Sequence, residues 1–186
     1  ANASPFTDAL ALSGLEAFRD GFWAAWEQDH ADANAGYSRI AYASLLSGIT
    51  LAQAGLGSVH GLASPLGAYF PIPHGVVCGT LMAEATAVNI QALREREPES
   101  PALHKYAHIS ELLTRRQYAD HLEAGDALVA LLRDWLERLN LPRLSAFGMG
   151  AAQMDTVVAN CRGGSMKTNP LVLLDEELAG LLAARM

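Results

Sequence analysis

The stretch between Arg39 and Glu84 constrains the fold more than any other feature, because it contains no Asp, Glu, Lys or Arg. An uncharged stretch of this length is normally buried, and a buried imidazole has to be hydrogen-bonded or bound to a metal. His60 and His74 are the two histidines within it, and glycines and prolines break the chain between them. We therefore expect any functional site to be built around this pair.

Composition narrows the class of protein further. The 186 residues are 51% hydrophobic, which predicts one compact domain over residues 1–186. A net charge of −7 argues against nucleic acid as a partner. A membrane span needs about 20 predominantly apolar residues, and Gly, Pro, Gln and His interrupt the uncharged stretch, so we expect central helices of a soluble bundle instead. Two cysteines without a CxxC spacing, and no signal peptide, favour a cytoplasmic protein.

Helical periodicity dominates the sequence and strand signals are nearly missing. Thr7 and Asp8 are expected to cap the first helix, and Asp175 the last. Three prolines within 65–73 predict a loop there. The expected helices cover residues 9–29, 35–54, a short segment around His60, 74–94, 102–113, 124–139, 150–161 and 176–184. The predicted fold class is all-α, a multi-helix bundle.

Spacing alone allows two interpretations of the two histidines. His60 and Ser64 are four residues apart and would share one helix face, while Pro73 directs His74 to the first turn of the next helix. Two imidazoles delivered in this way can converge on one metal ion. However, catalytic zinc sites usually have three protein ligands, so spacing alone favours two hydrogen-bonded core histidines.

Other polar residues have simpler explanations. His104 and His108 are also four apart, but their charged surroundings indicate a solvated helix face. His30 and His121 are expected at the surface. Cys78 lies in an apolar helical segment, which argues against a Cys–His nucleophile.

The segment from Gly55 onward resembles the signature of the iron-containing (group III) alcohol dehydrogenases, GLGxVHxxAHxLG followed by PHG. It reads GLGSVHGLASPLG at 55–67 and PHG at 73–75. The resemblance extends to the small-residue helix 41–48, the turn 141–145 and the Asn-Pro pair at 169–170. It covers essentially the whole chain.

This resemblance implies the C-terminal helical domain of that family, of the dehydroquinate-synthase-like type, with His60 and His74 as metal ligands. The family's N-terminal NAD(P)-binding α/β domain and its other two ligands, an Asp and a His four residues apart, are not in this chain. Asp8 does not supply them, since Leu12 stands four residues later. Ser64 replaces a family histidine that relays the alcohol proton, and a serine cannot take up that proton near neutral pH.

The resemblance predicts a parent enzyme that is an NAD(P)-dependent alcohol or aldehyde oxidoreductase with Fe²⁺ or Zn²⁺. This chain alone is expected to be inactive. Its partners would be the cofactor domain, a small alcohol or aldehyde and, through an exposed apolar face, a second copy. Two alternatives stay open: a non-catalytic helical interaction module, and a relative of the glycerol dehydrogenase or dehydroquinate synthase type.

Overall fold

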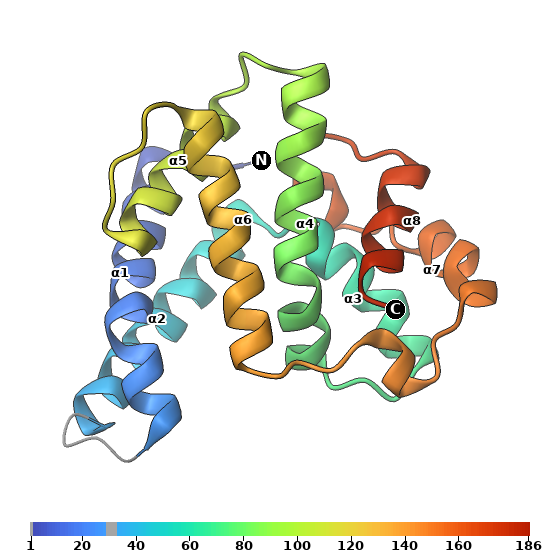
Figure 1. Cartoon of the computed structure of the whole chain (residues 1–186), viewed down its shortest axis with the longest axis horizontal. Coiled ribbons are helices and arrows are strands. Elements are labelled where there is room, and N and C mark those ends of the chain that lie inside the picture. Colours follow the sequence, from blue (N-terminus) through green and yellow to red (C-terminus); the bar gives the residue numbers. More distant parts are fainter. Residues whose placement is uncertain (1, 29–32) are drawn as a thin grey trace.

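The computed structural model describes residues 2–28 and 33–186, and within these ranges it contains helices and no strand (Figure 1). The predicted all-α fold is therefore confirmed. The α-helices are α1 (Pro5–Glu27), α2 (Ala33–Ala54), α3 (Ser58–Tyr69), α4 (His74–Arg96), α5 (Pro101–Thr114), α6 (His121–Arg138), α7 (Met154–Asn160) and α8 (Asp175–Ala184). Three short 3-10 helices, Leu144–Phe147, Ala151–Gln153 and Met166–Thr168, lie between them.

Helix α4 is the centre of the structure. In Figure 1 it stands between the α1–α2 pair on one side and α7 and α8 on the other. It packs against α3, α5, α6 and α8. One continuous core joins these elements, and its fully buried members include Leu62, Leu66, Leu81, Leu93 and Leu178. Burial of leucines on several helices around one axis is what fixes the orientation of α4.

Judged by length and composition only, α4 could cross a membrane, and α2 and α3 together would meet the same criterion as one bent pair of helices. Over half of the apolar window of α4, 56%, is buried inside the protein. We interpret α4 as the core helix of a globular domain on that ground.

Helix α1 begins earlier than the sequence indicated. The Ser4 hydroxyl accepts a hydrogen bond from the Thr7 backbone N–H at 3.3 Å, and the Thr7 hydroxyl accepts one from the Ser4 N–H at 2.8 Å. This reciprocal cap starts the helix at Pro5, so Asp8 is not the cap and instead binds Lys105 at 2.7 Å. The expected end at Asp29 lies outside the described residues.

The prediction that the uncharged stretch is interior was wrong for α2. Only Gly36, Ala43 and Leu46 of this helix are buried, and Tyr42 and Leu45 are 47% and 62% exposed. Helix α2 packs closely on α1 alone and presents its other apolar side to solvent.

The predicted loop at 65–73 was also wrong in its first half. Pro65 lies inside α3 and is buried, and the chain leaves the helix only after Tyr69. A proline in a helix interior removes one backbone hydrogen bond and costs about 3 kcal/mol. Burial of its ring beside Leu62 and Leu66 offsets that cost.

The last predicted helix boundaries shift for a similar local reason. Asp175 is the first residue of α8 and not its cap; the Glu177 carboxylate accepts a hydrogen bond from the Leu174 N–H at 2.6 Å. The single helix expected at 150–161 divides into a 3-10 turn followed by α7.

Candidate metal site

His60 is positioned by a sharp break between α2 and α3, which are bent by 97°. Gly55 has φ +77°, and a side chain there would also collide with Thr168, 2.6 Å from its hydroxyl oxygen. The Thr168 hydroxyl in turn donates a hydrogen bond to the Leu56 carbonyl. The glycine-rich segment thus lets the chain turn tightly against the 166–169 segment before α3 begins.

A buried polar network holds the first turn of α3. The Asn169 side-chain oxygen accepts a hydrogen bond from the Ser58 N–H at 2.9 Å, which satisfies one of the unpaired donors at the start of the helix. The Asn169 amide donates to Asn89 Oδ1 at 2.7 Å and to the Leu171 carbonyl at 2.9 Å. This network ties the helix that carries His60 to α4, which carries His74.

Helix α4 contributes two donor side chains at its start. Pro73 precedes the helix in an extended conformation, so that His74 is its first residue. Cys78 follows one turn later, and residues four apart on a helix share a face. Val77 and Thr80, on the other side of the same turn, are buried and hold this face in place.

The three side chains converge. Cys78 Sγ lies 3.7 Å from His60 Nε2 and 3.5 Å from His74 Nε2, and the imidazole centroids are 5.3 Å apart. Within residues 2–28 and 33–186, this is the one group of three His, Cys or carboxylate donors whose ligand atoms all lie within 4.8 Å. His74 is exposed and the other two are half-buried, so the cluster opens to solvent.

The protonation of the cluster follows from its surroundings. Burial, and then the charge of His74, lower the pKa of His60 below its usual value, which favours the neutral imidazole that metals bind. Burial raises the pKa of the Cys78 thiol. Its single proton can be donated to one of the two imidazoles at a time.

The structure brings together the two histidines expected from the sequence and adds a residue that the sequence analysis excluded. The sequence argued against a Cys–His nucleophile at Cys78 from α4 alone, whereas the structure places Cys78 beside both imidazoles because α3 docks against α4. The spacing His74-x-x-x-Cys78 was the available signal. Ser64 lies one turn beyond His60 and is exposed.

The other histidines do not form a comparable site. His104 and His108 are exposed on α5, as predicted. The His104 ring lies 5.1 Å from that of His121, at the start of α6, without a third donor in the part of the chain that the structure describes. His30 lies outside the described residues.

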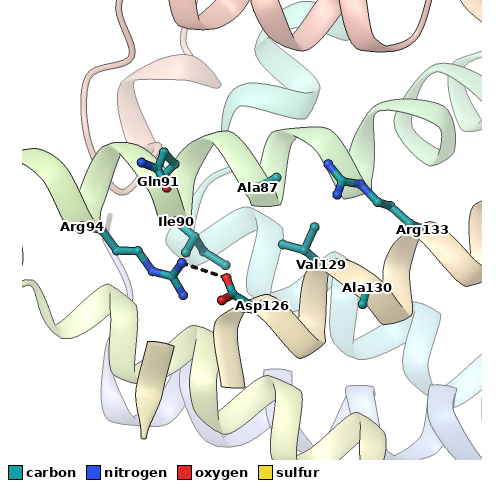
Figure 2. A pocket seen from close by; sticks show the side chains of 8 residues that line it. All are labelled: Ala87, Ile90, Gln91, Arg94, Asp126, Val129, Ala130 and Arg133. Carbon is teal, nitrogen blue, oxygen red and sulfur yellow. Dashed lines mark hydrogen bonds and ion pairs between the residues drawn. The ribbon is translucent and has the colours of Figure 1, made fainter. Parts of the chain in front are cut away.

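A groove between α4 and α6 is separate from the histidine cluster. Figure 2 shows Arg94 and Arg133 at its two ends, with Ile90 and Val129 between them. Arg94 donates to Asp126 at 2.8 Å, and Arg133 binds both carboxylate oxygens of Glu84. Because both guanidinium groups already have carboxylate partners, the groove offers little net charge to an anion.

The donor set fits a divalent metal ion. Neutral imidazole and thiolate are ligands of zinc and other first-row metals, and three protein ligands with an open position are typical of catalytic sites. A cluster of three donors that opens to solvent has the ligand number of catalytic zinc sites, whereas structural zinc sites have four protein ligands.

Comparison with known proteins identifies the family. Residues 1–186 match the model of the Fe-containing alcohol dehydrogenase family, C-terminal. The chain therefore belongs to the iron-containing alcohol dehydrogenases and corresponds to their C-terminal domain, which confirms the resemblance seen in the sequence.

Individual relatives of the chain are also named as alcohol dehydrogenases or oxidoreductases. The chain is 26% identical to alcohol dehydrogenase 4 of Schizosaccharomyces pombe over 99% of its own length and 41% of the relative's. The chain is 28% identical to the probable alcohol dehydrogenase EutG of Escherichia coli, over 98% of its own length and 43% of the relative's. A crystal structure of 1,3-propanediol oxidoreductase matches with TM-score 0.86 and 26% identity, covering 100% of this chain and 46% of that one. The chain thus spans less than half the length of these relatives.

Proposed function

We propose that this chain is the metal-binding part of an NAD(P)-linked oxidoreductase that interconverts small alcohols and aldehydes, with His60 and His74 as metal ligands. The observation that carries the proposal is the convergence of both imidazoles, with Cys78 Sγ 3.5–3.7 Å from their Nε2 atoms, in a chain of this family.

The names of several relatives support the substrate class. They include a 4-hydroxybutyrate dehydrogenase of Clostridium kluyveri, an NADPH-dependent butanol dehydrogenase of Clostridium saccharobutylicum and a 1,3-propanediol dehydrogenase of Klebsiella pneumoniae. Each name specifies a short-chain alcohol, and one specifies the cofactor. We extend a short-chain alcohol or its aldehyde to this chain as substrate, with a nicotinamide cofactor as hydride carrier.

The residues of the cluster suit that chemistry. A bound metal ion supplies a Lewis acid that polarises the substrate oxygen. His60 and His74 would hold it at the open end of the cluster, where His74 is exposed and a substrate can enter. Ser64, exposed one turn from His60, would donate a hydrogen bond to the substrate oxygen. Its hydroxyl cannot store a proton near neutral pH, so the alcohol proton would leave through solvent.

The nicotinamide cofactor would be bound outside this chain. A Rossmann fingerprint needs a strand before its glycine-rich loop, and the described residues form no strand. We therefore propose that a cofactor domain covers the open side of the cluster, and that the chain by itself does not turn over alcohol. The free thiols Cys78 and Cys161 suit a reducing, cytoplasmic setting.

The test is steady-state oxidation of butan-1-ol and propane-1,3-diol by the complete gene product, with NAD⁺ and NADP⁺. His60→Ala should lower kcat/KM about 1,000-fold, since a metal ion contributes several kcal/mol to the transition state. The matched control, His108→Ala, changes an exposed histidine of α5 and should leave kcat/KM unchanged. Full activity of His60→Ala would refute the proposed ligand role.

A further inference from the structure

We propose that Cys78 is itself a metal ligand, so that His60, His74 and Cys78 form a three-donor site that favours zinc over ferrous iron. This inference rests on the proposed function, in which His60 and His74 are metal ligands, and adds Cys78 to them as a third ligand. The preference for zinc follows from the chemistry of the three donor atoms.

The distances fit tetrahedral zinc closely. With Zn–S of about 2.3 Å and Zn–N of about 2.0–2.1 Å, a tetrahedral angle places sulfur and nitrogen about 3.6 Å apart. The observed separations from Cys78 Sγ are 3.7 Å to His60 Nε2 and 3.5 Å to His74 Nε2. Each sulfur–nitrogen pair therefore has the separation of two ligands of one zinc ion, and the ligand atoms of all three side chains lie within 4.8 Å of one another.

The helices that carry these donors hold them in place. His74 and Cys78 are four residues apart in the first two turns of α4, and α3 carries His60 against them. Buried Val77 and Leu81 fix the rotation of α4, and Gly61 lets α3 approach Cys161 and Met166 closely. Sites built on helices of the scaffold keep their geometry better than sites on loops.

The sulfur donor changes which metal the site prefers. On binding, a bond forms between the metal ion and Cys78 Sγ, and the thiol proton passes to solvent, while both imidazoles bind in their neutral forms. No electron is transferred. Thiolates favour zinc, whereas non-haem Fe²⁺ sites use two histidines and a carboxylate. Three protein donors in a cluster that opens to solvent also match catalytic zinc sites.

Cobalt(II) is the direct probe, because thiolate ligation produces a sulfur-to-cobalt charge-transfer absorption that histidine ligands do not give. The 186-residue chain is titrated with Co²⁺ alone, beside Cys78→Ser and the matched control Cys161→Ser, which removes the other free thiol. We expect the charge-transfer band in the unchanged chain and in Cys161→Ser. Cys78→Ser should lack it and keep only weaker d–d bands from histidine ligation.

Zinc affinity provides the second measurement. Loss of groups that merely orient a ligand costs about 10–100-fold in metal affinity, so loss of the ligand should weaken Zn²⁺ binding by at least that factor. The ratio of Zn²⁺ to Fe²⁺ affinity, measured anaerobically, should fall at least tenfold in Cys78→Ser.

The outcomes separate this inference from the proposed function. Cobalt binding without a charge-transfer band, or a band that persists in Cys78→Ser, overturns the role of Cys78 and leaves the two histidines as ligands. No binding of Co²⁺ or Zn²⁺ by the unchanged chain overturns the three-donor site. Binding that survives in a His60→Ala, His74→Ala variant contradicts the histidine ligands as well.

Discussion

Replacing Asn169 by alanine should destabilise the whole domain and disorder the start of α3. The Asn169 side chain is 6% exposed, and its loss leaves three buried groups without their partner: the Ser58 N–H, Asn89 Oδ1 and the Leu171 carbonyl. An unsatisfied buried polar group costs about 1–3 kcal/mol. Because water entering the cavity would satisfy some of them, we expect a loss of about 3–4 kcal/mol rather than the full sum.

The assay is urea unfolding followed by circular dichroism, in which a lower midpoint at constant slope reports lost stability. Asn160→Ala is the matched control, because that exposed asparagine makes one bond to the carbonyl of Thr156 within α7. It should cost less than about 0.5 kcal/mol. If Asn169→Ala were no more destabilising than Asn160→Ala, the network would not be what holds His60 in position.

Two further predictions concern packing and charge. Gly36→Ala should destabilise the domain by at least about 2 kcal/mol, because the new Cβ would lie 2.8 Å and 2.9 Å from backbone atoms of α1. The control is Gly48→Ala on the same helix, which has open space around it and should stabilise the domain by up to about 1 kcal/mol. Equal effects of the two variants in thermal unfolding would refute the close approach of α2 to α1. The Arg19 guanidinium, and after it Arg115, lower the pKa of Asp20 to about 2, below its unfolded value, so this carboxylate stabilises the fold above about pH 4 and the contribution is lost as pH falls toward 2. Asp20→Asn should therefore cost about 1 kcal/mol at pH 6, after allowance for partial solvent exposure, and almost nothing at pH 2; a difference independent of pH would contradict this.

Much of the fold was predictable because helical periodicity and Gly and Pro positions are local signals. The break at Gly55, the start of α4 at His74 and the all-α class follow from them. The predicted first residues of helices were less accurate where the capping residue lies upstream of the apolar pattern. Asp120 accepts hydrogen bonds from the N–H groups of Leu122 and Glu123 at 2.8 Å, so α6 begins at His121, ahead of the predicted residue 124.

Tertiary contacts account for what the sequence did not indicate. Pro65 continues a helix because its ring is buried against the core, which propensity rules do not consider. Leu45 is exposed although it lies in a long uncharged stretch, because charge content does not say which helix covers which. Cys78 joins the two histidines only through the docking of α3 on α4, and its spacing from His74 becomes informative once that docking is known.

The most direct test of the account is zinc binding by the 186-residue chain, measured by equilibrium dialysis with metal analysis. We predict about one Zn²⁺ per chain, as three protein ligands suffice for a zinc site. A His60→Ala, His74→Ala variant should bind none, while His104→Ala, His108→Ala, which removes the exposed pair on α5, should bind as the unchanged chain does. Equal binding by all three chains, or none by the unchanged chain, would contradict the assignment of this cluster as a metal site.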